Sequence, residues 1–245
     1  MYVIKELVKH PHYGFNELHL NCLKKYKKGE KLPEFKYVSV AKKGSGGVTP
    51  LHFACINPDV SILKQVLAVN PDFNLQDGRM RRPIHYAAAC ESTGPLEYLI
   101  QKGANVLDVD DRKTNCLHLA IKAKRADNVK MILAQGDGKG EQLIKMRDRS
   151  GLNAMAMACE VSDLKIIQEL IKFGVKVNQG VGKERMQPLG WAAAKGNYEL
   201  CEWLLDNKAR VQGGDKFKRT ALIMAVRNGH LKVASLLLQR GSDWQ

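Results

Sequence analysis

The chain has 245 residues with 39 Lys and Arg against 25 Asp and Glu, so its formal net charge is +14 and its pI is about 9.5. A hydrophobic content of 44% is typical of folded domains and excludes a disordered polycation. The apolar stretches are too short to cross a bilayer, the first residues lack a signal-peptide core, and six Cys are too few for a disulfide scaffold. These features predict a soluble intracellular protein, cytoplasmic or nuclear, that binds something acidic.

A six-residue pattern recurs along the chain, beginning with Thr49-Pro50-Leu51-His52-Phe53-Ala54. We take its third residue as an anchor and number other positions as offsets from it. The anchors, at intervals of 33, 33, 38, 34 and 33 residues, are Leu51, Ile84, Leu117, Met155, Leu189 and Leu222. An apolar pair recurs at offsets +15 and +16, Gly occupies offset +19 in four repeats, and Asp occupies offset −7 in four. Several positions recurring in register indicate a repeat architecture.

This pattern resembles the ankyrin repeat, which has a period near 33 and a Thr-Pro-Leu-His-x-Ala signature. The resemblance implies an all-α solenoid of stacked helix-turn-helix units with finger-like turns. We therefore expect an ankyrin-repeat domain of about six repeats over residues 44–245. Residues 1–43 are expected to hold an N-terminal cap and a divergent repeat with a basic insertion, in which Leu18, His19 and Cys22 keep the first-helix register.

Local departures from the pattern lead to further expectations. The 38-residue interval places five extra residues around Gly136–Gly140, which predicts an extended glycine-rich loop. The recurrent Gly at offset +19 predicts a left-handed end to each second helix, which Asn70 tolerates and Lys208 adopts less readily. Residues 1–9 form an amphipathic stretch that favours a capping helix. The chain stops where another finger would begin, which favours a longer parent protein.

The reactive-looking residues fit structural roles. His19, His52, His85 and His118 share offset +1, so stacking spaces them along a row, whereas metal ligands converge to about 2 Å from one ion. The resemblance implies that these His side chains hydrogen-bond within and between repeats. Cys22, Cys55 and Cys159 share offset +4 and are expected to be inert core thiols. Trp191 and Trp203 occupy core offsets, whereas the pattern predicts no structural role for Trp244.

No motif of catalysis or phosphate binding is present in the sequence, so we expect no enzymatic activity, no cofactor and no metal site.

The resemblance places partner recognition on the finger tips and the exposed side of the first helix, at offsets −6, −5, −3, +5 and +6. Across the five repeats from Ile84 onward, ten of these 25 positions are basic, against 39 of 245 in the whole chain. Only three are acidic, namely Asp111, Glu160 and Glu184. We call the ten basic residues and their apolar neighbour Phe217 the basic face: Arg79, Arg81, Arg112, Lys122, Arg149, Lys183, Lys195, Lys216, Phe217, Arg219 and Arg227.

The function predicted from this face is protein–protein interaction, with an acidic or extended partner segment bound by Lys and Arg. Three other interpretations stay open: simple solvation of exposed positions, binding of nucleic acid or another polyanion, and a regulatory region of a larger enzyme such as a tankyrase-like ADP-ribosyltransferase. A basic N-terminal run either extends the face or is a solvated loop. It comprises Lys24, Lys25, Lys27, Lys28, Lys31 and Lys36, with Tyr26, Phe35 and Tyr37 interleaved.

Overall fold

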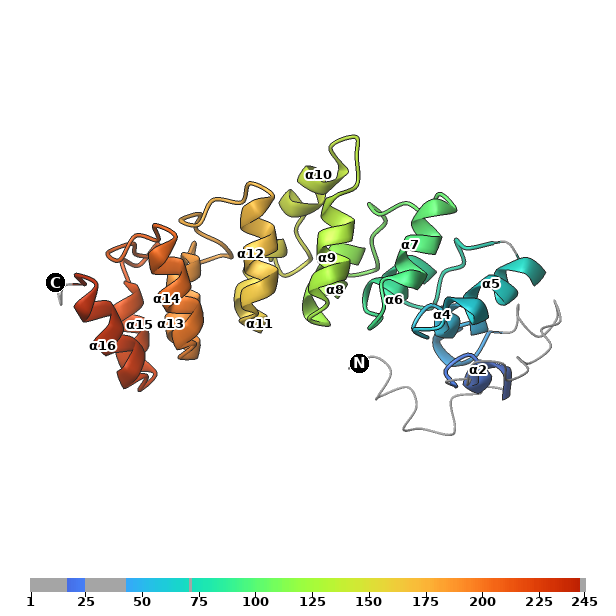
Figure 1. The fold of residues 1–245 in the computed structure, drawn as a ribbon, viewed down its shortest axis with the longest axis horizontal. Coiled ribbons are helices and arrows are strands. Elements are labelled where there is room, and N and C mark those ends of the chain that lie inside the picture. The colour runs from blue at the N-terminus through green and yellow to red at the C-terminus, as the bar shows by residue number, and fades with distance from the viewer. Residues whose placement is uncertain (1–16, 25–42, 71, 243–245) are drawn as a thin grey trace. The chain divides into compact units, whose positions relative to one another are not determined.

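The computed structural model describes residues 17–24, 43–70 and 72–242 (Figure 1). The chain divides into two compact units, Met1–Gly140 and Glu141–Gln245. Within the described residues every regular element is a helix, and β-type pairing is limited to an isolated bridge between Val181 and Met186. The predicted all-α ankyrin-repeat solenoid is therefore confirmed, whereas the predicted boundary between residues 43 and 44 stays a prediction.

The first unit consists of short first helices alternating with second helices. Its elements are α2 (Glu17–Asn21), η1 (Ser45–Gly47), α4 (Pro50–Ala54), α5 (Val60–Val69), α6 (Pro83–Ala88), α7 (Gly94–Gln101), α8 (Cys116–Lys122) and α9 (Ala126–Leu133). α10 (Lys139–Lys145) begins at the end of this unit and runs into the next. The second unit repeats the plan with α11 (Ala154–Val161), α12 (Leu164–Lys172), α13 (Pro188–Lys195), α14 (Tyr198–Asp206), α15 (Ala221–Arg227) and α16 (Leu231–Gln239).

The first helices begin where the sequence supplies a start signal. α4, α6 and α13 have Pro at their first position, where no hydrogen bond from an amide is missed. α8, α11 and α15 are instead capped by Asn115, Asn153 and Thr220, whose side-chain oxygens accept the amide three residues on. The two solutions produce the same helix start in every repeat.

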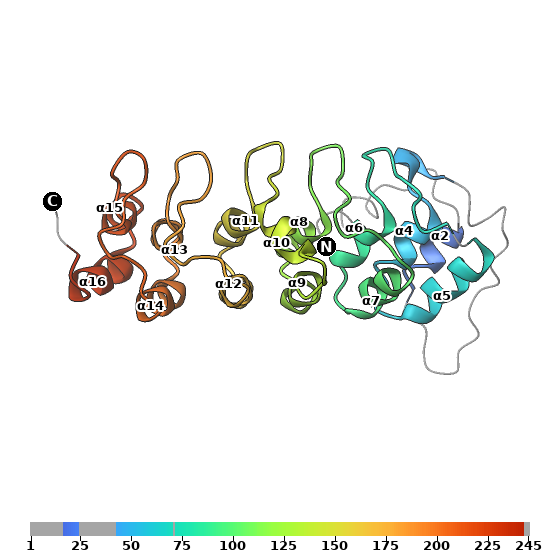
Figure 2. The same cartoon turned by 90° about the horizontal axis from the view of Figure 1, so that it is seen from above.

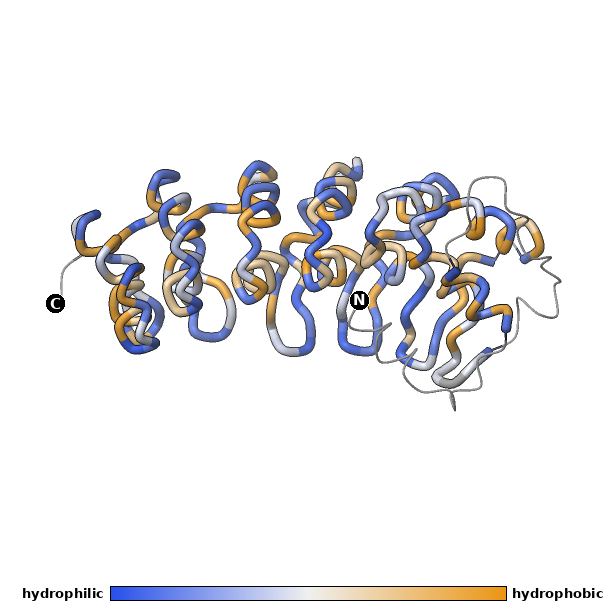
Figure 3. The backbone as a smooth tube through the Cα atoms, turned by 60° about the horizontal axis from the view of Figure 1, so that its bottom comes forward, coloured by the Kyte–Doolittle hydropathy of each residue, from blue (hydrophilic) through white to orange (hydrophobic). Residues whose placement is uncertain are grey.

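Two layers of helices build the core of each unit. First helices pack on first helices (α4 on α6 and α6 on α8; α11 on α13 and α13 on α15), and second helices pack on second helices (α5 on α7; α14 on α16). Figure 2 shows the fingers projecting from the first-helix side, and Figure 3 shows them as largely hydrophilic. All six anchors are buried, and so are the residues at offset +15: Val66, Leu99, Ile132, Leu170, Leu204 and Leu237. Each such side chain stabilises the stack by about 2 kcal/mol.

Three of the four histidines at offset +1 bond to the next repeat, as predicted. His19 Nε2 donates to the carbonyl oxygen of Val48 (3.2 Å), and His52 Nε2 donates to that of Arg81 (3.2 Å). His85 Nε2 donates to the carbonyl oxygen of Asp108 at 3.1 Å. Burial lowers the pKa of His52 to about 4, so the neutral ring is the form that the fold selects.

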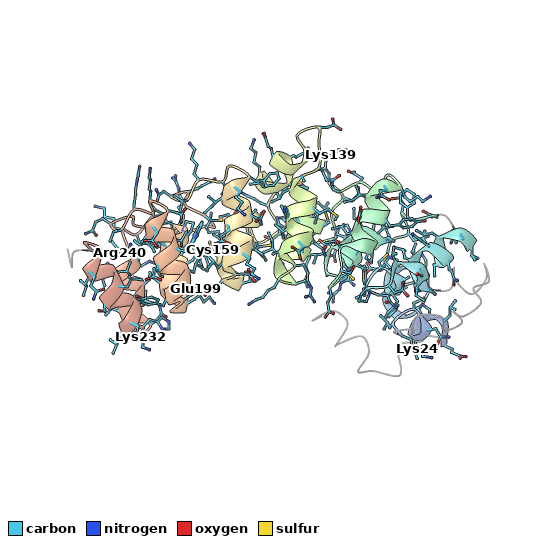
Figure 4. The ribbon with its side chains drawn as sticks, in the orientation of Figure 1. Lys24, Lys139, Cys159, Glu199, Lys232 and Arg240 are labelled. Atoms are coloured by element: carbon cyan, nitrogen blue, oxygen red, sulfur yellow. The ribbon has the colours of Figure 1, made fainter. Side chains whose placement is uncertain are left out.

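All six cysteines are buried and unpaired with one another, including Cys159 on α11 (Figure 4). The three predicted core thiols, Cys22, Cys55 and Cys159, are 0% exposed, which confirms their placement in the core. Trp191 and Trp203, in contrast, are only half-buried.

Buried amides add further links between repeats. Asn128 Nδ2 donates to the carbonyl oxygens of Ala88 (3.0 Å) and Cys90 (3.1 Å), and Asn57 Nδ2 donates to the carbonyl oxygen of Cys22. These bonds satisfy carbonyls at the ends of the preceding first helices, which helix geometry leaves without partners.

The prediction of an extended loop around Gly136–Gly140 was wrong, because a short turn is followed there by the helix α10. Leu143 on this helix is 0% exposed, so burial of an apolar side chain outweighs the glycine content. Gly140 permits the packing, since a Cβ there would lie 2.2 Å from the carbonyl oxygen of Leu133. Lys139 at the start of α10 is labelled in Figure 4.

The left-handed helix ends were predicted in part. Gly103, Gly174 and Gly241 have φ values of 91°, 92° and 86°. Gly136 does not have a left-handed backbone. The left-handed residues after α9 are instead Asp137 and Gly138. Asn70 was expected to be left-handed but is extended with φ −133°, whereas Lys208 adopts φ 66° despite its side chain. The predicted cap at residues 1–9, the basic run after Lys24 and Trp244 lie outside the described residues.

Candidate partner-binding surface

An aspartate at offset −7 shapes four of the fingers from within. Asp77 Oδ1 accepts the amides of Arg79 (2.8 Å) and Arg81 (2.9 Å), two and four residues later. Asp110, Asp148 and Asp215 make the same pair of hydrogen bonds in their own fingers. Because these bonds fix the backbone, the side chains at offsets −6 to −3 project from a preformed turn.

Neighbouring fingers are also joined to each other within each unit. In the first unit the amide of Asp111 donates to the carbonyl oxygen of Arg79 at 2.9 Å, and in the second the amide of Lys216 donates to that of Glu184 at 2.9 Å. In both cases offset −6 of one finger meets offset −5 of the preceding one. This link aligns the predicted contact positions from finger to finger.

Nine of the eleven residues of the basic face are exposed. In the first unit they are Arg79, Arg112 and Lys122, and in the second they are Arg149, Lys183, Lys195, Lys216, Phe217 and Arg227. The structure therefore brings three predicted residues to the surface in one unit and six in the other, on fingers and on the last turns of first helices.

Arg81 and Arg219 are the two exceptions, and both serve the fingers internally. The Arg81 side chain is 11% exposed, its Nε donates to Asp77 Oδ2 at 2.7 Å, and its guanidinium lies over the ring of Tyr86. Arg219 Nε likewise donates to Asp215 Oδ2 at 2.7 Å, and its Nη2 contacts Glu184 of the neighbouring finger.

Burial tends to raise the pKa values of Asp77 and Asp215, but hydrogen bonds and the arginine charge outweigh it and lower both. In Asp77 the largest lowering influence is the hydroxyl of Tyr86, which donates to Oδ2 at 2.7 Å. These aspartates thus remain ionised inside the fingers. Much of the charge of Arg81 and Arg219 is consequently neutralised within the chain.

Phe217 gives the second unit an exposed aromatic group at a finger tip. Its side chain is 59% exposed, the Nζ of Lys216 lies 4.8 Å from the ring centroid, and the guanidinium carbon of Arg219 lies 4.9 Å from it. The two cations stabilise this ring in an exposed position. An apolar contact and positive charge are therefore presented together.

Sequence reasoning missed the residues at offset −4. Lys113, Arg185 and Lys218 occupy this offset, are exposed, and have φ values of 57°, 55° and 61°. The same repeat arithmetic, extended to this offset, would have shown three basic residues among five positions. The left-handed backbone, however, could be learned only from the structure.

A separate cavity of about 410 Å³ lies in the second unit beside α10, lined by Ile144, Arg147 and Phe173 among others. Its cations are already engaged, since Arg147 donates to the carbonyl oxygen of Gly151 and Lys145 lies 3.9 Å from Glu141. No residue of the basic face lines it.

Within 17–24, 43–70 and 72–242, no helix has the length and apolar character needed to cross a membrane. No group of three or more His, Cys, Asp or Glu is gathered as metal ligands would be in that part of the chain.

Comparison with known proteins gives matches along most of the chain. The family described as "Ankyrin repeats (3 copies)" matches residues 51–143, 137–215 and 155–245. The poly(ADP-ribose) polymerase tankyrase of Caenorhabditis elegans is 33% identical over 223 residues, which cover 84% of this chain and 10% of that protein. The nuclear factor NF-kappa-B p105 subunit of Gallus gallus is 28% identical over 210 residues, covering 83% of this chain and 21% of that protein.

The probable 26S proteasome regulatory subunit p28 of Saccharomyces cerevisiae is 26% identical over 208 residues, covering 80% of this chain and 73% of that protein. The chain thus spans a small part of tankyrase and p105 and most of p28. The family match extends over all six anchored repeats, in which the structure shows paired helices and fingers. This chain therefore belongs to the ankyrin repeat family.

Proposed function

We propose that this chain is a non-catalytic module that binds an acidic segment of a partner protein on its basic face. The observation that carries the proposal is the exposure of nine of the eleven predicted residues, five of which lie on fingers held by internal hydrogen bonds. Glu184, one of the three acidic residues among the 25 positions, is already paired with Arg219. Positive charge is therefore available to a partner at these positions, whereas negative charge is scarce.

The binding free energy at such an exposed charged face is the sum of several weak contacts. An exposed ion pair is worth about 0.2–1 kcal/mol, so stable binding needs several of them in register. The fingers supply the register, because their backbones are fixed before the partner arrives and little conformational entropy is lost on binding. Arg79, Arg112 and Arg149 add the option of bidentate pairing with carboxylates.

The relatives support a protein partner. By their names, p28 is a regulatory subunit of the 26S proteasome and p105 is a subunit of a nuclear factor, so both belong to protein assemblies. We accordingly place this module inside the cell, in the cytoplasm or the nucleus.

Charge reversal tests the proposal. The variant Arg79→Glu/Arg112→Glu/Arg149→Glu changes three exposed residues of the basic face, and Lys130→Glu/Lys165→Glu/Lys232→Glu makes the same charge change on the second helices α9, α12 and α16. Lys232 on α16 is labelled in Figure 4. Partners are captured on immobilised chain after nuclease treatment, and their contacts are mapped by cross-linking with mass spectrometry.

We expect the basic-face variant to lose the acidic proteins that wild type captures and the second-helix variant to keep them. Equal loss from both variants would mean that net charge alone recruits the partners. If capture instead disappears with nuclease treatment, and if affinity for DNA or RNA falls linearly on a log–log plot against salt, the ligand is a nucleic acid.

A second candidate rests on the tankyrase match, which covers 84% of this chain at 33% identity. In this alternative the repeats are the recognition region of a larger enzyme of the ADP-ribosyltransferase type. Sequencing of the full transcript tests it, because the reading frame must then encode a transferase domain in addition to the repeats.

A further inference from the structure

Two finger corners of the second unit hold long basic side chains where glycine is the least strained residue. Arg185 has φ 55° and Lys218 has φ 61°, and both lie at offset −4. At the same offset of the neighbouring finger the chain uses Gly151, with φ 83°. A left-handed backbone is unfavourable for residues with a Cβ and accessible to glycine. The basic residues at these corners are thus kept at a cost in stability.

The surrounding backbone fixes both corners. A Cβ at Gly180 would lie 2.4 Å from the carbonyl oxygen of Arg185, and a Cβ at Gly214 would lie 3.1 Å from the Cα of Lys218. The amide of Lys218 also donates to the carbonyl oxygen of Asp215 at 2.9 Å. The corner conformation is therefore imposed by the finger, and the side chains of Arg185 and Lys218 are not needed to form it.

The charged groups at these corners have no partner within the described part of the chain. Arg185 and Lys218 are exposed, and within the described residues their side chains have no hydrogen bond or ion pair. Lys183 and Lys216 on the same two fingers are exposed as well. These fingers therefore present four cations that no carboxylate of the described chain neutralises.

Phe217 indicates which kind of polyanion fits. Its ring is exposed, yet the Nζ of Lys216 and the guanidinium carbon of Arg219 lie over it at 4.8 and 4.9 Å from the centroid. These cations compete with a nucleobase for the ring, whereas one acidic protein segment can place an apolar side chain on the exposed part of the ring and pair its carboxylates with the neighbouring cations.

We infer that Arg185 and Lys218 are partner-contact residues for the carboxylates of an acidic protein segment, with Phe217 as the contact for a large apolar side chain of that segment. The inference rests on the proposed function and adds to it the residues and the partner chemistry of these two fingers. Specificity then requires both acidic residues and an apolar residue in the partner.

The test compares Lys218→Gly with Lys208→Gly in the full chain. Lys208 is also an exposed lysine with a left-handed backbone, φ 66°, in the same unit, but it lies at the end of α14 rather than on a finger. Both variants remove the same charge and relieve the same kind of strain. Binding is measured by fluorescence anisotropy with a glutamate-rich peptide containing one Phe, the same peptide with Ser for Phe, and oligo(dT).

We expect Lys208→Gly to bind the Phe-containing peptide as wild type does, Lys218→Gly to bind it about threefold more weakly, and Arg185→Gly/Lys218→Gly about tenfold more weakly. The finger variants should keep or raise the thermal midpoint, so weaker binding cannot be a folding defect. Phe217→Ala should remove the preference for the Phe-containing peptide over its Ser counterpart.

Equal weakening by Lys208→Gly and Lys218→Gly would overturn the inference, and so would unchanged binding in the finger variants. A larger effect on oligo(dT) than on the peptides would also overturn it, in favour of nucleic acid. The variant Lys195→Glu/Arg227→Glu, on the first helices, distinguishes a failure of the finger-corner inference from a failure of the proposed function. If only this variant weakens peptide binding, the proposed function stands and the finger-corner inference fails. If wild type binds neither peptide, both fail.

Discussion

His52 bonds to its own repeat through one ring nitrogen and to the next repeat through the other. Its Nε2 donates to the carbonyl oxygen of Arg81 at 3.2 Å, and its Nδ1 accepts the amide of Thr49 at 3.1 Å. Both bonds require the neutral ring protonated on Nε2, because a proton on Nδ1 would eliminate the acceptor. The stacking of these repeats is therefore coupled to the protonation of one side chain.

The first prediction is a loss of stability on mild acidification. The pKa of His52 is lowered to about 4 by burial, from 6.5 in the unfolded chain, so the unfolded state takes up the proton first. The stability that the neutral His52 ring contributes is fully present above pH 6.5 and is lost as the pH falls toward 4. Between pH 7 and pH 5 it amounts to about 2 kcal/mol, measurable by urea unfolding followed by circular dichroism.

The variant His52→Ala serves as the control for this prediction. It should be less stable than wild type at pH 7 but lose less stability between pH 7 and pH 5. Some dependence of stability on pH should remain in this variant, because burial also lowers the pKa of His85. A variant that keeps the full wild-type slope would show that His52 does not cause it.

The second prediction concerns the aspartates inside the fingers. Asp215→Asn should lower the free energy of unfolding by about 2 kcal/mol, because Oδ2 is replaced by an amide that faces the guanidinium of Arg219. Asp148→Asn is the matched control: Asp148 accepts the same two backbone amides, and its carboxylate has no arginine partner in the described chain. Its cost should stay below about 1 kcal/mol. Equal costs in urea unfolding would contradict a separate role for the ion pair.

The third prediction concerns the buried amide of Asn128. Asn128→Ala leaves the carbonyl oxygens of Ala88 and Cys90 without their shared donor. We expect a loss of about 2–3 kcal/mol and faster hydrogen exchange in α8 and α9. Asn105→Ala removes an exposed asparagine that also makes two hydrogen bonds, and should change stability by less than about 1 kcal/mol. Similar exchange rates in the two variants would argue against this link.

The fourth prediction uses two glycines near α10. Replacing Gly by Ala inside a helix normally stabilises it by about 1 kcal/mol. Gly140→Ala should do the opposite, because the new Cβ would lie 2.2 Å from the carbonyl oxygen of Leu133, whereas Gly136→Ala meets nothing within 4 Å. Hydrogen exchange over Lys139–Lys145 should therefore accelerate only in Gly140→Ala. Protected amides there in both variants would mean that the close approach is readily relieved.

The repeat architecture could be predicted from the sequence because every repeat must bury the same positions. The six anchors and their partners at offset +15 are periodic, and all are buried. α10 could not be predicted in the same way. It occurs once, so no periodicity indicates it, and the burial of Leu143 depends on tertiary packing rather than on local glycine content.

The basic face was predictable as a set of positions but not as a set of available charges. Sequence offsets identified Arg81 and Arg112 equally, yet only the folded finger shows that Arg81 is paired with Asp77 while Arg112 is exposed. Lys218 shows the reverse: the offsets did not select it, yet the structure leaves it exposed on a left-handed backbone that its residue type disfavours.

The burial of all six cysteines has a practical consequence for measuring partner docking. Burial raises the pKa values of Cys22, Cys116, Cys159 and Cys201 to about 12 and raises those of Cys55 and Cys90 as well, so none carries appreciable thiolate at neutral pH. A thiol introduced by Phe217→Cys or Lys208→Cys would react with maleimide dyes ahead of all six. Fluorophores can thus be attached to chosen surface positions while every native cysteine is left in place.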